Sequence, residues 1–250
     1  MSRCHADASG CHSDRSRCHP ERSEGAVAAH RFRTLVAVAL LAAATLAVAA
    51  PAPAQDAQSI VGRSSRVYRS LASLSADFVQ VIDNPMIDSA ESRGTLVQAG
   101  PAKLAMRFTE PPGEAIVIDG EHVWVYTPST VPGQVVRLRA PSGGPVYGYN
   151  LLAWFLDRPA ERYKARFLRQ DKIGTRIMDV VELVPAVPDL PFERAVLWLD
   201  REDALPRRLE ITEQSGALRT LSLSKLRVNQ KVPDDIFQFK VPSGVRVVDQ

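Results

Sequence analysis

The fold of this chain is constrained most by a period-two alternation of apolar and other residues, which begins near residue 75 and recurs toward the C-terminus. In KLAMRFTE (103–110), Leu104, Met106 and Phe108 share one face of an extended chain, and mostly polar residues share the other. Such alternation is typical of a β-strand with one buried face. Asp119-Gly120 lies between two apolar segments, EAIVI and HVWVY, which indicates a tight hairpin.

About eleven strands are expected, at the spacing of hairpins and with a single helical interruption. This order favours an antiparallel meander over a parallel α/β sheet, and a sheet so large normally curls or closes. The fold class is therefore mainly β with a few helices. The predicted strands are 75–82, 92–99, 103–110, 114–118, 122–126, 133–139, 164–170, 176–184, 194–200, 207–213 and 217–226, and 236–239 closes the series.

Two segments predict helices. Residues 58–75 place Ile60, Val67, Leu71 and Leu74 at helical spacing, as in a helix with one apolar stripe. NLLAWFLD (150–157) is apolar almost all round and begins with Asn, a favourable N-cap residue. Two helical turns are not stable alone, so we expect this helix to lie against the apolar sheet face. The glycines before it would allow it to move.

The N-terminal region carries the pattern of an export signal. Residues 30–33 include two arginines, residues 34–50 are uncharged and apolar, and Ala52-Pro53-Ala54 offers small residues for cleavage. Ala47-Val48-Ala49 is a second candidate cleavage signal. A retained anchor is the alternative reading, but this Ala-rich run is shorter than the roughly 20 residues that span a bilayer.

We therefore interpret residues 30–54 as a signal peptide and residues 55–250 as a single mature domain. No cysteine follows the apolar run at the position that bacterial lipoproteins acylate. The expected product is a soluble, exported protein without disulfides, and the resemblance described below implies the periplasm as its compartment.

The three cysteines all lie in Cys-His pairs at a seven-residue repeat: Cys4-His5, Cys11-His12 and Cys18-His19. Thiolate and imidazole bind zinc, but structural zinc sites usually separate the members of a ligand pair by two to four residues. We interpret residues 1–29 as a mis-assigned or repeat-derived extension, with translation starting later, for example at Val27.

The remaining chain offers little catalytic chemistry. After residue 54 it has one histidine, His122, and no cysteine. An activated nucleophile, a metal-ligand set and a phosphate-binding glycine motif are all missing from the sequence pattern. The net charge of +3 is small, and aromatic residues do not interleave with basic runs. We expect no enzyme activity, no cofactor, no metal and no nucleic-acid partner.

Two longer blocks resemble the periplasmic outer-membrane lipoprotein carrier family over roughly residues 58–250. The first is GTLVQAGPAKLAMRFTEPPGEAIVIDGEHVWVYTP (94–128), preceded by FVQ after the amphipathic helix. The second, at 205–249, includes Phe-x-Phe-x-x-Pro-x-Gly-Val. The resemblance implies an unclosed antiparallel β half-barrel with an α-helical lid over an apolar cavity.

The resemblance also implies a transport function. Such a carrier takes acylated lipoproteins from an inner-membrane lipoprotein-releasing ABC transporter, shields their acyl chains, and passes them to an outer-membrane receptor. A monomer is expected. The candidate cavity residues are Leu104, Met106, Phe108, Ile116, Ile118, Trp124 and Tyr126, and the candidate lid residues are Leu71, Leu151, Leu152 and Phe155. Ordinary core packing is the alternative for each of them.

One position departs from the family pattern. The family often has an arginine before the Pro that opens the 103–110 strand, and that arginine is thought to hold the lid. Here the position is Gly100, before Pro101, so we expect the lid to be held differently. The second hypothesis is a regulatory half-barrel that binds lipid or an envelope partner such as an anti-sigma factor, although 250 residues are expected to leave no room for the additional domain of those regulators.

Overall fold

The computed structural model describes residues 56–141, 148–187 and 190–250. The predicted extension with its Cys-His repeat and the predicted signal peptide lie outside these residues, as do residues 142–147 of the glycine-rich stretch. The helices are α2 (Ala57–Ser70), α3 (Leu151–Leu156), α4 (Pro159–Arg162) and the 3₁₀ helix η1 (Asp234–Phe237). The strands are β1 (Ser73–Asn84), β2 (Ile87–Ala99), β3 (Lys103–Glu110), β4 (Ala115–Ile118), β5 (His122–Tyr126), β6 (Gln134–Arg139), β7 (Tyr163–Ile173), β8 (Arg176–Pro185), β9 (Phe192–Asp200), β10 (Pro206–Glu213), β11 (Leu218–Val228) and β12 (Arg246–Asp249).

These strands form one twelve-stranded sheet in the order β12-β6-β5-β4-β3-β2-β1-β11-β10-β9-β8-β7. Two runs of antiparallel neighbours, β1–β6 and β7–β11, meet where β1 pairs with β11, with Phe78 opposite Leu223. β12 pairs with β6 in parallel. The edges are β7 and β12, so the sheet is unclosed, as predicted, but it consists of two meanders and not one.

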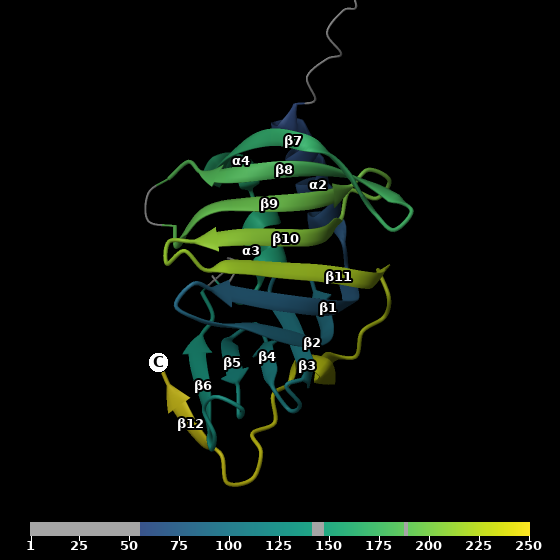
Figure 1. Ribbon diagram of the computed structural model, residues 1–250. Helices are drawn as coiled ribbons and strands as arrows, with labels where there is room; N and C mark the ends of the chain where they lie inside the picture. Colours follow the sequence, from purple (N-terminus) through teal and green to yellow (C-terminus); the bar gives the residue numbers. More distant parts are fainter. Residues whose placement is uncertain (1–55, 142–147, 188–189) are drawn as a thin grey trace, which may run out of the picture. The chain divides into compact units, whose positions relative to one another are not determined.

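Helices α2 and α3 cover one face of the sheet, which we call the inner face. Figure 1 shows α2 and α3 behind the strands on this side. Alternate residues of the strands pack there with the apolar face of α2 and with all of α3 in one buried cluster. The period-two pattern thus has its physical cause in a sheet with one face buried under helices.

The first helix is shorter than predicted. It begins at the N-cap Asp56, whose side chain accepts a hydrogen bond from the Gln58 backbone N–H, and it ends at Ser70. Leu71 is already extended, with φ −74° and ψ 129°. Leu74 therefore lies in β1, where it packs on the inner face with Ala76 and Phe78. Leu74 fits both the helical spacing of α2 and the alternation of β1. The predicted helix was therefore extended too far, to residue 75.

The closing segment was also predicted wrongly. Residues 236–239 do not form a strand: Asp234–Phe237 form η1, and the last strand is β12, ten residues later than expected at Arg246–Asp249. Pro233 precedes η1, and the Phe237 side chain packs against Ala115 and Val117 on the outer face of the sheet. An aromatic pair separated by one residue suggested a strand, but these residues cover the sheet instead of extending it.

Candidate functional site

The inner face is the candidate site, because it combines a large apolar surface with a separate covering helix. Leu104, Met106 and Ile118 are buried there, and Phe108 and Ile116 are partly buried against the same cluster. Five of the seven predicted cavity residues therefore share this face. Phe108 packs edge-on against Phe78, with 5.1 Å between ring centroids.

Trp124 and Tyr126 do not belong to this face, and their predicted position is wrong. Trp124 packs with the cluster around Phe237 on the outer face. Its ring stacks on Phe239 at 5.6 Å, and the Tyr126 ring lies 5.8 Å from the same Phe239 ring. Both aromatics are covered by the C-terminal segment.

The register of the β4–β5 hairpin explains this placement. Ile118 is opposite Val123, and Ile116 is opposite Val125. Since paired residues in adjacent strands point to the same face, Val123 and Val125 lie on the inner face, where both contact the cluster. Sequence reasoning missed these two valines, although a two-residue turn at Gly120-Glu121 would have fixed the register.

All six residues of α3 are buried. The predicted lid residues Leu151, Leu152 and Phe155 lie in the inner-face cluster, and Leu71 packs against it from the end of α2. The Phe155 ring lies against Phe192 and Tyr163, at 5.4 and 5.7 Å between centroids. In this structure α3 fills the inner face and does not merely cap it.

Side chains from three elements hold the C-terminal carbonyls of α3. Ser65 on α2 donates to the Leu156 carbonyl at 2.7 Å. The Tyr163 hydroxyl and the Arg162 guanidinium both donate to the Trp154 carbonyl, at 3.0 and 3.1 Å. These bonds satisfy carbonyls that a short helix would leave unpaired.

Gly100 contributes no side chain to this arrangement. It has φ of +59°, and a Cβ there would have nothing within 4 Å. Beside it is a pocket of about 270 Å³, lined by Tyr68, Arg69, Leu71, Ser73, Leu74, Gln98, Gly100, Pro101 and Asp157. The place of the family's arginine is thus partly open in this chain.

A second, smaller pocket of about 80 Å³ lies between α3 and the inner face of β1–β4. Its lining includes the predicted residues Leu104, Met106, Ile116, Leu151 and Leu152. Ligand pockets usually have volumes of roughly 300–1,000 Å³. Neither pocket reaches that range, so neither pocket as it stands in this structure accommodates a large apolar ligand.

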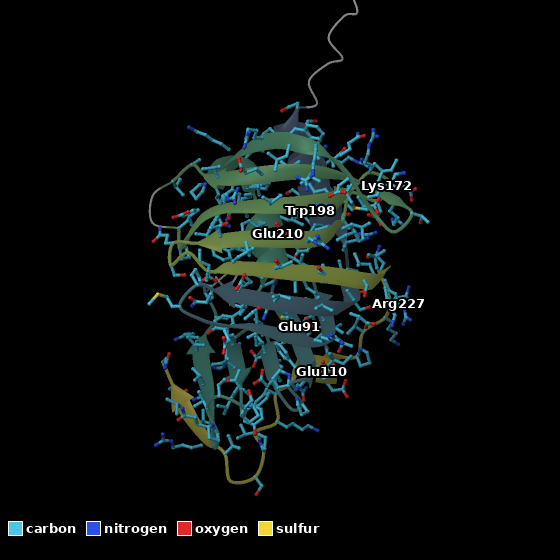
Figure 2. The ribbon with its side chains drawn as sticks, viewed as in Figure 1. Glu91, Glu110, Lys172, Trp198, Glu210 and Arg227 are labelled. Carbon is cyan, nitrogen blue, oxygen red and sulfur yellow. The ribbon has the colours of Figure 1, made fainter. Side chains whose placement is uncertain are left out.

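The outer face carries its own apolar clusters under long polar side chains. Figure 2 labels Trp198 on this side of β9. The Trp198 ring is nearly buried, with the guanidinium groups of Arg169 and Arg208 at 5.7 and 5.5 Å from its centroid. Because these arginines cover the ring, the outer face offers no open apolar surface at Trp198.

His122 lies at the start of β5 and does not join a metal-ligand set. Its Nδ1 is 4.0 Å from the Asp119 carboxylate. Among residues 56–141, 148–187 and 190–250, no three His, Cys, Asp or Glu side chains gather in a group suited to a metal ion. In the same part of the chain, no helix has both the length and the apolar character needed to cross a membrane.

Comparison with known proteins identifies the family. The model of the family described as outer membrane lipoprotein carrier protein LolA matches residues 69–240. The chain belongs to the outer-membrane lipoprotein carrier family. A carrier from Methylobacillus flagellatus is 26% identical over 212 residues, which cover 84% of this chain and 98% of the relative.

Other relatives agree with this assignment. The outer-membrane lipoprotein carrier protein of Alkalilimnicola ehrlichii is 27% identical and is matched over 81% of its length and 74% of this chain. The crystal structure of an uncharacterized conserved protein from Thermus thermophilus aligns with a TM-score of 0.51 at 14% identity, over 78% of this chain and all of that one. This structural likeness supports the fold only.

Proposed function

We propose that this protein is a periplasmic carrier that shields the acyl chains of lipoproteins on its inner face and moves them from the inner to the outer membrane. The observation that carries the proposal is the continuous apolar inner face, closed by a short helix that could not be stable without it. Membership of the lipoprotein carrier family supports the same function.

The physical requirement is a site that holds acyl chains and still releases them. Burial of each methylene stabilises a bound chain by about 0.8 kcal/mol. In the closed structure, α3 side chains such as Leu152 and Phe155 occupy the inner face. An acyl chain replaces their contacts when α3 moves out, so the net free energy of binding is smaller than the burial alone. Competition of this kind permits both uptake and release.

The proposal also covers how the protein is exported and which membrane proteins load and unload it. We propose that residues 1–29 are a dispensable extension, that residues 30–54 direct export, and that residues 55–250 act as one soluble monomeric domain. An inner-membrane ABC transporter would load the carrier and an outer-membrane receptor would unload it. The protein acts by binding, without catalysis.

The test is to purify residues 55–250 from the periplasm and to identify bound acylated material by mass spectrometry. Release of a lipoprotein from spheroplasts by the purified protein is the second measurement. If no acylated ligand binds and no lipoprotein is released, the proposal is wrong. Capture of a regulatory envelope protein without any lipid would favour the half-barrel regulator instead.

A single substitution tests the inner face itself. Ile116 is half-buried and lines the smaller pocket, so Ile116→Glu places a carboxylate where acyl chains are expected, and we predict loss of acyl binding with the fold retained. The matched control is Val79→Glu, at the 36% exposed Val79 next to Phe78 but on the outer face. A fluorescent fatty-acyl probe measures both variants, and equal binding by the two would contradict the assignment.

A further inference from the structure

Helix α2 has three exposed arginines, Arg63, Arg66 and Arg69. The guanidinium of Arg63 reaches the turn between β9 and β10, where Nη1 donates to the Arg201 carbonyl at 3.0 Å and Nη2 donates to the Glu202 carbonyl at 2.9 Å. Within the described residues, Arg66 and Arg69 have no such bond. The fixed fork of a guanidinium suits two adjacent acceptors, so one side chain ties α2 to the sheet.

The β9–β10 turn (201–205) holds these two carbonyls in place through its own hydrogen bonds. The Asp200 carboxylate accepts the Glu202 backbone N–H at 2.8 Å. The Arg201 backbone N–H donates to the Ile177 carbonyl of β8 at 3.0 Å. Both acceptors of the Arg63 guanidinium therefore belong to residues whose N–H groups are fixed by the sheet.

Asp200 is the buried charge that stabilises this turn. It is 1% exposed, and the side chains of Arg176 and Arg207 both pair with it. Burial alone would raise the pKa of this carboxyl, but the hydrogen bonds from Arg176 and the Glu202 N–H, with the charge of Arg207, outweigh it, and the pKa is lowered. Because a buried charge is costly to unpair, we expect the turn to keep its shape when α2 moves.

Helix α2 connects this turn to α3. Two residues after Arg63, the Ser65 hydroxyl donates to the Leu156 carbonyl at the end of α3. Near the end of α2, the Tyr68 hydroxyl accepts a hydrogen bond from Gln98 on β2. Figure 1 shows α2 behind the strands of the second meander, and it contacts β7, β8 and β9 there. A displacement of α2 together with α3 must therefore break the bonds of Arg63.

We propose that Arg63 is a reversible anchor that holds α2, and through it α3, on the inner face until cargo enters. The inference rests on the proposed carrier function and adds the residue that sets how readily the inner face opens. In this role Arg63 contacts no acyl chain, so it is a positioning residue.

The exposure of the Arg63 bonds suits them to repeated opening. The bond between Gln98 and Tyr68 is buried, so breaking it would leave polar groups without a partner, which is costly. The Arg63 guanidinium and its two acceptor carbonyls lie at the surface, where water replaces the lost bonds. Since the turn keeps its shape, the same two carbonyls are ready when α2 returns.

The experiment compares Arg63→Met with the matched control Arg66→Met. Each variant removes one guanidinium from the exposed side of α2 and leaves an unbranched side chain. Hydrogen exchange is measured without cargo on residues 55–250. Exposed hydrogen bonds contribute modestly, so we expect exchange in residues 57–70 and 151–156 to become about 3- to 10-fold faster in Arg63→Met only. Exchange in β1 and β11 should not change.

A fluorescent fatty-acyl probe supplies the second measurement. Only the closed state loses hydrogen bonds in Arg63→Met, so this variant should bind the probe more tightly by up to the same factor. The affinity of Arg66→Met should equal that of the unmodified protein. A merely structural contact would not raise affinity, so this measurement separates an anchor from a general contribution to stability.

Equal exchange in the two variants overturns the anchor and, because no cargo is present, leaves the carrier function intact. Faster exchange throughout the sheet, or unchanged affinity for the probe, also overturns it. Failure of the unmodified protein to bind the probe contradicts the carrier function, and with it the role of Arg63 in loading. If Arg63→Met does not fold, Arg63→Lys, which keeps the charge but lacks the fork, should show smaller changes in the same direction.

Discussion

Asp119 is the residue that organises the β4–β5 hairpin. Its carboxylate accepts backbone N–H bonds from His122 and Glu121 at 2.7 and 2.8 Å and the Trp124 indole N–H at 2.8 Å. Burial alone would raise the pKa of this carboxyl, but the hydrogen bonds from Trp124, His122 and Glu121 outweigh it, and the pKa is lowered. The charged form is therefore the one that the hairpin stabilises.

This arrangement predicts a pH-dependent effect of Asp119→Asn. A carboxyl whose pKa is lower in the folded state stabilises the fold above its unfolded pKa of about 4 and loses this contribution as the pH falls through the folded pKa. We expect the variant to be less stable by about 1–2 kcal/mol at pH 7, with the difference shrinking below about pH 4. Urea unfolding of both proteins from pH 2 to 7 measures this, and a constant difference would contradict it.

Residues in β3 and in the β4–β5 hairpin show when the sequence alone can assign a side chain to one face of the sheet. Leu104, Met106 and Phe108 could be placed on one face because side chains alternate between the two faces along a regular stretch of strand. Trp124 and Tyr126 could not be placed by apolar character, since their large rings suit either face. Only the pairing of Ile118 with Val123 decides their side, and pairing is a property of two strands.

Helix α3 is an element whose position depends on side chains far away in the sequence. The Ser65 hydroxyl on α2 donates to the Leu156 carbonyl in a buried bond between residues 91 positions apart. We predict that Ser65→Ala lowers the free energy of unfolding by about 1 kcal/mol and speeds hydrogen exchange in residues 151–156. Ser70→Ala is the matched control, because Ser70 Oγ donates within its own helix to the Val67 carbonyl. Equal exchange in the two variants would show that Ser65 does not hold α3.

Elements with a strong local pattern were predictable, and weakly patterned ones were not. β3 begins and ends at the residues expected from alternation, and β5 at those expected from the hairpin signal at Asp119-Gly120. β12 contains four residues, Arg-Val-Val-Asp, which are too few to show a period. Its pairing with β6 is supported by the side chains of Arg137 and Asp249, 2.5 Å apart, and such a contact across more than a hundred residues leaves no local signal.

At the scale of the whole molecule, the pairing of β1 with β11 creates the continuous inner face. It joins the two meanders, and Phe78 and Leu223 become neighbours in one buried cluster. Hairpin signals specify only strands that follow one another in the chain, so the sequence predicts the pairings within each meander but neither the division into two meanders nor their junction. The family resemblance supplied the unclosed half-barrel that local patterns could not.

Under the carrier function proposed above, the closed structure competes with the cargo for the inner face. If α3 leaves the inner face when acyl chains bind, a change that weakens α3 packing raises the energy of the closed state only, and affinity should increase. Phe155 in α3 is fully buried on the inner face, and Phe237 in η1 is similarly buried on the outer face. Phe155→Leu and Phe237→Leu should therefore each lower stability by about 1–2 kcal/mol, and only the first should bind acyl chains more tightly.

The affinity of Phe155→Leu for acyl chains can rise at most by the factor that corresponds to this loss of stability, about 5- to 30-fold. Titration with a fluorescent fatty-acyl probe, alongside thermal unfolding of both variants, gives the two quantities. Weaker binding by Phe155→Leu would mean that this ring contacts the acyl chain in the loaded carrier and does not compete with it. Tighter binding by Phe237→Leu would mean that stability of the whole fold, and not the position of α3, limits uptake.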